Sequence, residues 1–300
     1  MRIYLSSIAP QIILDLYNIR DDLKLNVLQP FVFRNNQGID ATLWSAMKGI
    51  TNSLFLDSGT FELFNRSDLY DVEECFNKYA LSLDSLSGVF DLYANFDPDY
   101  KSNDRFVVNL SFQNRLEEMG FMPIPVMHSK DNEEIEFYLK SKYDLIAISA
   151  QVVNKLSSKS INMIVDRFNA VGKRVHLLGI GSYAKLKDSN AWSCDCSSFI
   201  RWAASGRAIF FSEIQQKEVT LSFSSHNKNG VPNSDYYNSP NNKYLRDEYE
   251  NFIAYEIGFD LNDVAADTSK LVMLNALYLK LREEVITQRQ KDRSIQFGVW

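Results

Sequence analysis

Short apolar runs rich in β-branched and aromatic residues alternate along the chain with segments whose apolar residues recur at helical spacing. The runs predict strands over residues 2–6, 26–33, 53–57, 89–96, 122–127, 143–149, 174–179 and 191–195. The segments between them predict helices over residues 10–21, 40–49, 69–82, 104–119, 131–141, 157–171 and 182–189. Eight strands, each but the last followed by a helix, are typical of a (β/α)8 TIM barrel, and we expect that α/β fold.

The pattern changes after the eighth strand. A short helix is expected over 197–205, then a β-hairpin over 207–223 and a polar loop over 224–243. Two helical segments follow, over 244–257 and 267–290. We expect a catalytic barrel core over residues 1–210, with the hairpin, the loop and the C-terminal helices of 244–300 packed on the same domain.

Composition narrows the class of protein. The 300 residues are 45% hydrophobic and 23% charged, as in an ordinary globular domain. No apolar run approaches the ~20 residues of a membrane span, and the N-terminus does not have the pattern of a signal peptide. With only three cysteines, which cannot all pair, we expect a cytoplasmic protein. The net charge of −6 gives no global support for nucleic-acid binding, which would need a local basic surface.

The expected strands end in residues capable of chemistry. In a barrel of this kind, catalytic groups lie at the carboxyl ends of the strands and on the loops that follow. These ends hold Asp57 with Ser58, Asp97, His128, Ser149 with Gln151, Gly179 with Gly181, and Asp195. Carboxylates and a histidine would therefore converge at one rim of the barrel.

Several of these residues also have a structural interpretation. Asp57, in the segment LFLDSGTFE of residues 54–62, is either catalytic or the cap of the next helix. His128 is either a general base or hydrogen-bond donor, or a structural residue. The two glycines of HLLGIGS, residues 176–182, could cradle a phosphate or form a close turn beside a planar ligand. Cys194 and Cys196 flank Asp195, but zinc sites need about four ligands, so we expect buried thiols and no metal.

Three motifs resemble those of a known family. They are Asp57-Ser58-Gly59-Thr60-Phe61, Leu177-Leu178-Gly179-Ile180-Gly181 and Cys194-Asp195-Cys196. Their order, spacing and strand positions are similar to those of the tRNA-guanine transglycosylase superfamily. The chain looks closest to the phage and bacterial branch that places 7-deazaguanines in DNA. The resemblance covers roughly residues 1–210.

The resemblance implies a role for the matching residues. Asp195 would attack C1′ of the sugar, expel guanine and form a covalent glycosyl-enzyme intermediate. Asp57 would transfer protons as one base leaves and the next attacks. Phe61 would stack on the base, and Asp97 would accept hydrogen bonds from its guanine-like edge. His128 stands where the tRNA enzymes have a glutamine near the base carbonyl.

The remaining base-binding residues include departures from the family pattern. Ser58, Gly179 and Gly181 match it, whereas Ser149-Ala150-Gln151 replaces a Gly-Gly-Leu segment that contacts the 7-substituent. Thr60 replaces a glycine, which would narrow the pocket. The C-terminal zinc subdomain of the tRNA enzymes is absent, because no cysteine lies beyond position 196. No cofactor is implied.

The leading hypothesis is therefore a DNA-guanine transglycosylase that inserts a base such as 7-cyano-7-deazaguanine. In duplex DNA the target nucleotide would have to be flipped out of the stack. The same exchange on tRNA is the main alternative, and a non-catalytic partner subunit is a further one. Another barrel enzyme, such as a glycosidase with a Trp-lined sugar groove, would have to use Trp192 or Trp202, and the pattern places neither at the rim. Possible protein partners are a second copy of the chain, in a homodimer, or an accessory protein.

Overall fold

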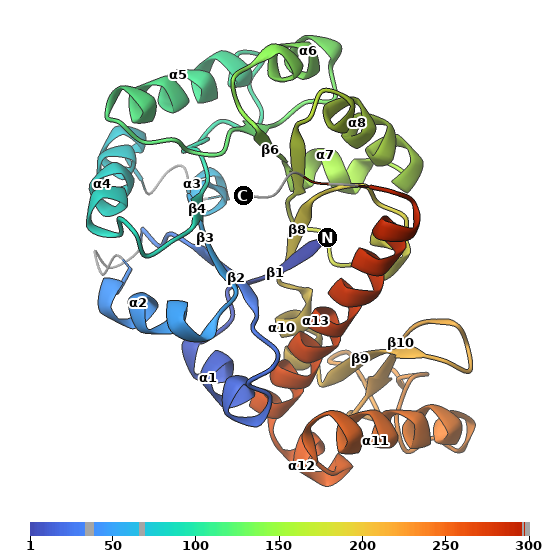
Figure 1. The fold of residues 1–300 in the computed structure, drawn as a ribbon. Helices are drawn as coiled ribbons and strands as arrows, with labels where there is room; N and C mark the ends of the chain where they lie inside the picture. Colours follow the sequence, from blue (N-terminus) through green and yellow to red (C-terminus); the bar gives the residue numbers. More distant parts are fainter. Residues whose placement is uncertain (34–38, 66–69, 296, 298–300) are drawn as a thin grey trace.

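The computed structural model describes residues 1–33, 39–65, 70–295 and 297. Within these residues eight parallel strands form one curled sheet: β1 (Arg2–Ser6), β2 (Asn26–Pro30), β3 (Ser53–Asp57), β4 (Leu92–Tyr93), β5 (Val126–Met127), β6 (Leu145–Ile148), β7 (Arg174–Leu177) and β8 (Ser193–Cys196). Their order in the sheet is β4-β3-β2-β1-β8-β7-β6-β5. A parallel bridge between Ala94 and Ile124 joins the two edge strands. The sheet therefore closes into the expected (β/α)8 barrel (Figure 1).

Strands β4 and β5 are much shorter than the ranges expected for them, 89–96 and 122–127. Pro123 and Pro125 flank the bridging residue Ile124, and proline has no N–H to donate to a ladder. Ile124 pairs by donating to the Tyr93 carbonyl and accepting from the Asn95 N–H, each at 2.8 Å. The barrel therefore closes at this seam through isolated bonds instead of a long ladder.

The helices expected between the strands are present with shifted ends: α1 (Pro10–Ile19), α2 (Ala41–Ile50), α4 (Val72–Ser85), α5 (Arg105–Glu118), α6 (Asn132–Lys140), α8 (Ser158–Ala170) and α9 (Tyr183–Leu186). Residue 69, at the start of one expected range, lies outside the described residues. Asp40 and Asp71 cap α2 and α4 by accepting from the backbone N–H groups of Leu43 and Glu74.

Two short helices were not expected: α3 (Thr60–Asn65) and α7 (Ala150–Lys155). Each begins directly after a strand-end residue, α3 after Gly59 and α7 after Ser149. They therefore lie near the carboxyl ends of the strands and carry Phe61 and Gln151, two residues of the expected site.

The chain beyond β8 also follows the expected order. It comprises α10 (Ser198–Ala204), the antiparallel hairpin of β9 (Arg207–Ser212) and β10 (Lys217–Ser222), the 3-10 turn η2 (Pro240–Asn242), α11 (Lys243–Ile257), α12 (Leu261–Ala266) and α13 (Thr268–Asp292). Helix α12 is an addition to the expected elements. Residues 296 and 298–300, at the end of the C-terminal part expected over 244–300, lie outside the described residues.

Helix α13 takes the place of an eighth barrel helix. It packs against β1, α1 and α10, and in Figure 1 it runs beside the barrel between α1 and α8. The buried Asn275 joins it to the elements after β8, since its side chain accepts from Ile209 N–H and donates to the carbonyls of Phe199 and Arg207. The barrel is thus completed by a segment about 70 residues downstream of β8.

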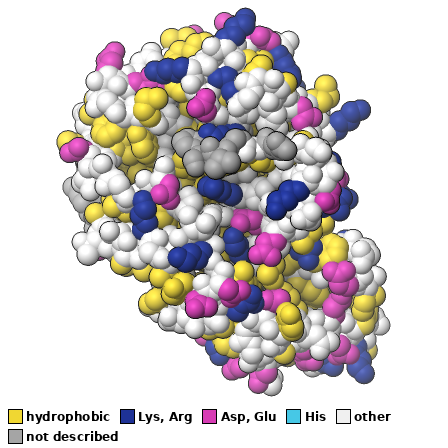
Figure 2. Space-filling view, in the orientation of Figure 1, with side chains coloured by type: hydrophobic (Ala, Val, Ile, Leu, Met, Phe, Trp, Pro, Cys, Tyr) yellow, Lys and Arg dark blue, Asp and Glu magenta, His cyan; other side chains and the backbone are white. Residues whose placement is uncertain are grey.

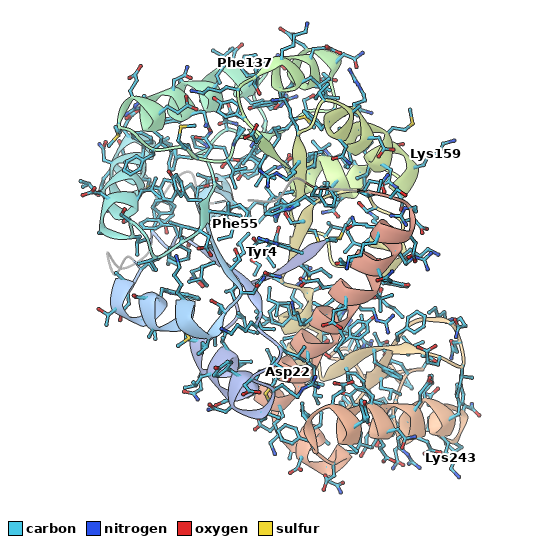
Figure 3. All side chains as sticks on the ribbon, in the orientation of Figure 1. Tyr4, Asp22, Phe55, Phe137, Lys159 and Lys243 are labelled. Atoms are coloured by element: carbon cyan, nitrogen blue, oxygen red, sulfur yellow. The ribbon has the colours of Figure 1, made fainter. Side chains whose placement is uncertain are left out.

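Two apolar cores support the barrel. The outer core lies between the strands and the helices. The inner one fills the barrel with inward-facing side chains from successive strands, among them Tyr4, Leu28, Phe55 and Ala147. Tyr4 and Phe55 meet edge to face with ring centroids 5.6 Å apart, and Figure 3 shows both near the barrel axis. The bottom and middle of the barrel are therefore solid, so a ligand has access only from an end.

The surface carries charges of both signs. Figure 2 shows basic and acidic side chains interspersed over the face in view, without a broad field of one sign. No helix in the described ranges is long and apolar enough to cross a membrane.

Glu283 of α13 ties this helix to the first two strands. Its Oε2 accepts hydrogen bonds from Ile3 N–H at 2.6 Å and Asn26 Nδ2 at 2.7 Å, and its Oε1 accepts from Lys280. The side chain is buried, so these donors have no access to replacement partners in water.

We therefore expect Glu283→Ala to lower the free energy of unfolding by about 2–5 kcal/mol, because it leaves buried donors unpaired. Urea denaturation measures the change. The exposed neighbour on the same helix, Glu284→Ala, is the matched control and should change stability by less than about 0.5 kcal/mol. Equal effects of the two substitutions would contradict the role given to Glu283.

Candidate active site

A cavity of about 790 Å³ opens at the carboxyl ends of the strands. Nine of the ten expected site residues line it: Asp57, Phe61, Asp97, His128, Ser149, Gln151, Gly179, Gly181 and Asp195. The exception is Ser58, which is buried behind the wall. The two aspartates proposed for catalysis thus face one common space, and neither points away from the barrel mouth.

Asp57 ends strand β3 and is half-buried at the cavity wall. Its Oδ2 accepts a hydrogen bond from Gly59 N–H at 3.1 Å. Burial raises the pKa of Asp57 to about 7, and the nearby carboxylates of Asp97 and Asp195 add to the rise, whereas backbone hydrogen bonds from Gly59 and Ser58 oppose it. Its acid and base forms are therefore both populated near neutral pH, as a proton-transfer group requires.

Asp195 lies within strand β8 and is 7% exposed. Its Oδ1 accepts a hydrogen bond from Gly179 N–H at 2.9 Å and lies 3.4 Å from Nε2 of His176. No described residue donates to Oδ2. One carboxylate oxygen is therefore fixed by the protein while the other is available to the cavity, which suits a nucleophile.

Asp97, which we expected to accept hydrogen bonds from the guanine-like edge of a base, also accepts hydrogen bonds within the protein. Its Oδ1 accepts hydrogen bonds from the hydroxyls of Ser58 at 3.1 Å and Thr60 at 2.7 Å. Its Oδ2 lies 2.5 Å from Nε2 of His128, which donates to it. Both oxygens of this buried carboxylate thus already have protein donors, and Asp97 orients the side chains around it.

Two buried polar atoms at the cavity have no hydrogen-bond partner among the described residues: Nδ1 of His128 and Oγ of Ser149. They come from the ends of neighbouring strands, because Ser149 N–H bonds to the Met127 carbonyl next to His128. Buried polar atoms without partners are rare in proteins. A ligand with polar edges would satisfy both of them.

Aromatic side chains form one wall of the cavity. Phe61 of α3 is 60% exposed and lines it. Tyr100, which sequence reasoning missed, has its ring edge-on to His128 at 4.8 Å and its hydroxyl 2.9 Å from Thr60 Oγ1. Its position three residues after Asp97 in ANFDPDY was the available signal. This wall offers a flat apolar surface to a planar ligand.

Thr60 does not narrow the pocket as we expected. Thr60 is 1% exposed, does not line the cavity and turns its hydroxyl to Asp97. The glycines matter more for the shape of the wall. A Cβ on Gly59 would lie 2.0 Å from the Phe31 carbonyl oxygen, and one on Gly181 would lie 2.4 Å from Sγ of Cys196.

The opposite side of the cavity contains residues that the sequence analysis did not assign to the site. They are Lys185 of α9, Arg201 and Trp202 of α10, and Glu218 of β10. Neither Lys185 nor Arg201 forms an ion pair with any residue in the described ranges. Trp202 does reach the rim, whereas Trp192 is buried in the inner core. This side combines cationic and aromatic surface beside the carboxylates.

Within the described ranges, the cysteines have no partners that would make a metal site. Cys75, Cys194 and Cys196 are free and buried, and burial raises the pKa of the Cys196 thiol to about 11. Among the residues that the structure describes, no group of three or more His, Cys, Asp or Glu side chains could hold a metal ion.

Comparison with known proteins adds no family assignment. No protein-family model and no curated protein matches the chain. The resemblance to guanine transglycosylases therefore rests on the three sequence motifs, and the function on the residues of the cavity.

Gly59 offers a test of how the wall around Asp57 is built. It has a φ of 72° and directly faces the Phe31 carbonyl, whereas Gly120 has a φ of 91° with nothing near its Cβ position. Alanine at either position pays about 1–2 kcal/mol for left-handed backbone. We expect Gly59→Ala to destabilise the protein by about 1–3 kcal/mol more than Gly120→Ala, because of the clash. Urea denaturation of both variants measures this difference, and equal losses would show that the contact with Phe31 relaxes freely.

Proposed function

We propose that this protein exchanges guanine in DNA for a 7-deazaguanine base through a covalent glycosyl-aspartate intermediate. The observation that carries the proposal is the unequal state of two carboxylates at one cavity. Asp195 has one oxygen fixed and the other available, whereas the pKa of Asp57 is raised to about 7. A nucleophile with one oxygen available to the cavity, beside a group that exchanges protons near neutral pH, is what base exchange requires.

In the first half of the reaction, Oδ2 of Asp195 bonds to C1′ of the target nucleotide as the C1′–N9 bond breaks. The electron pair of that bond leaves with guanine, and Asp57 in its acid form donates the proton that neutralises the departing base. The transition state has oxocarbenium character, so the carboxylates around the cavity stabilise its positive charge.

In the second half, a 7-deazaguanine enters the same pocket. Asp57, now ionised, removes the proton from N9 of the incoming base, and N9 attacks C1′. The bond between C1′ and Asp195 breaks, and its electron pair returns to the carboxylate. The new base thus replaces guanine at C1′, and the proton that Asp57 gave to guanine is replaced by one from the incoming base. Both aspartates end in their starting forms.

The base would lie against the aromatic wall. Phe61 supplies exposed aromatic surface for stacking, while His128 and Ser149 supply unpaired polar atoms for its edges. Gly179 and Gly181 form the loop beside Asp195, and Gln151 of α7, which also lines the cavity, is the residue that we propose for contact with the 7-substituent. Nδ1 of His128 accepts a ligand N–H when the ring is neutral, because Asp97 holds the Nε2 proton.

The polymer is proposed from the charge at the rim. Lys185 and Arg201 supply the local cationic surface that the net charge of −6 does not. Trp202 beside them can stack on a flipped-out or neighbouring base. The free cysteines fit the cytoplasm as the place of action. The alternative substrate is tRNA, with the same exchange reaction. The protein would act as a homodimer or with an accessory protein in either case.

The covalent intermediate can be trapped. Incubated with a guanine-containing DNA oligonucleotide, the protein should form a denaturation-resistant adduct and should incorporate radiolabelled guanine into the DNA. Asp195→Ala should abolish both signals, because no nucleophile remains. The exposed Asp84→Ala should leave them unchanged and is the control. Label in tRNA alone would move the proposal to tRNA, and label in neither polymer would overturn base exchange.

The pH dependence tests Asp57 separately. Since its pKa is raised to about 7, the acid form that protonates guanine is lost as the pH rises through that value. We expect the single-turnover rate of adduct formation to fall about tenfold per pH unit above pH 7. Asp57→Asn should reduce the rate by about 10²–10⁴-fold and remove this dependence. Rapid-quench measurements across the pH range decide the point, and a flat profile would exclude Asp57 as the acid.

A further inference from the structure

A fully buried histidine lies directly beneath the nucleophile. His176 of β7 is 0% exposed, and its Nε2 lies 3.4 Å from Oδ1 of Asp195. It belongs to the barrel interior and does not line the cavity, so it has no access to a substrate. Any effect on the reaction must therefore pass through Asp195.

The ring of His176 is held in one orientation. Its edges meet Tyr4 and Phe55 with centroid distances of 5.8 Å and 5.1 Å, and Figure 3 shows these two aromatic side chains at the centre of the barrel. Nδ1 lies 2.7 Å from Oγ of Ser193, the residue paired with His176 across β7 and β8. Packing and hydrogen bonding together leave the imidazole no room to turn.

The proposed role of Asp195 sets the tautomer that His176 needs. A nucleophilic carboxylate only accepts hydrogen bonds, so in that role Nε2 of His176 carries the hydrogen that faces Asp195. In the neutral ring Nδ1 is then the acceptor, and Ser193 is its hydroxyl donor. The chain Ser193–His176–Asp195 is thus a directed set of bonds that ends at the nucleophile.

We propose that His176 is a positioning residue for Asp195, an inference that rests on the nucleophilic role proposed above. Together with Gly179 N–H, it holds Oδ1 from below and keeps Oδ2 turned to the cavity. When Oδ2 bonds to C1′, Oδ1 becomes the ester carbonyl and still accepts from both donors. When the ester breaks, the same donors receive the returning charge. No proton moves through His176.

The substitutions that test this differ in which bond they retain. His176→Gln places an amide N–H at the distance of Nε2 and so keeps the bond to Asp195. His176→Asn reaches only as far as Nδ1 and keeps the Ser193 side, and His176→Phe keeps neither. Tyr4→Phe is the matched control: it removes the hydroxyl that bonds to Ser53, also buried in the barrel, and leaves the ring against His176.

We expect His176→Asn and His176→Phe to slow adduct formation by about 10–100-fold, because a nucleophile misplaced by about 1 Å loses this much. The KM for the oligonucleotide should stay within about twofold, since the residue does not reach the cavity. His176→Gln should recover most of the rate, and Tyr4→Phe should resemble the wild type. Full activity of His176→Asn, or a change confined to KM, would overturn the proposal. Thermal unfolding checks that each variant is folded. If His176→Phe is not folded, the test rests on comparing His176→Gln with His176→Asn.

A measurement without substrate separates this inference from the proposed function. ¹⁵N NMR of the imidazole rings, with only three histidines in the chain, should show His176 with its hydrogen on Nε2. Asp195→Ala should remove that preference, and Tyr4→Phe should retain it. A ring with its hydrogen on Nδ1 in the wild type would overturn the positioning role even if Asp195 forms the adduct. If Asp195→Ala still forms the adduct, the proposed nucleophile is wrong, whatever the tautomer of His176.

Discussion

Carboxylates gathered in a partly buried cavity must each be hydrogen-bonded, paired or protonated, because burial penalises their charge. This constraint organises the site. Asp97 receives two hydroxyls and an imidazole, and Asp195 receives a backbone N–H and a second imidazole. Asp57 receives only backbone donors from the residues that the structure describes, so burial and the nearby carboxylates raise its pKa to about 7. The different roles that we propose for the aspartates correspond to the unequal distribution of donors among them.

Two departures from the guanine transglycosylase pattern meet at one carboxylate. Thr60 stands in place of a glycine and His128 in place of a glutamine, and both bond to Asp97. Each looks like an isolated change along the sequence, yet in the fold they form one unit with Ser58. A histidine whose Nε2 is held by a carboxylate presents Nδ1 to the cavity, which a glutamine would not do in the same way. Changes at Thr60 and His128 should therefore be coupled, because both side chains bond to the same carboxylate.

The spacing of apolar residues predicted most of the strands and helices, and the residues at the predicted strand ends gave most of the candidate site. Strand order and the convergence of Asp57, Asp97 and Asp195 follow from the rule that the strands of a barrel end at one rim. Contacts between elements could not be predicted in this way. Neither the imidazole of His176 beneath Asp195 nor the approach of Lys185 and Trp202 from the other side is visible, because each depends on how distant segments pack. The brevity of β4 and β5 was in principle readable from Pro123 and Pro125, which interrupt the ladder.

The placement of α13 has a consequence for how the molecule acquires its structure. The strands β1 and β8 pair with each other, but α13, the helix that packs on β1, is made only after the hairpin, α11 and α12. During synthesis on the ribosome, the apolar outer surface of β1 stays without this helix until residues 268–292 emerge. Contacts across such long sequence separations form slowly, since the loop between them must be ordered first. Barrel completion is therefore a late event. A chain interrupted before α13 leaves the apolar surface of β1 exposed to chaperones and to other nascent chains.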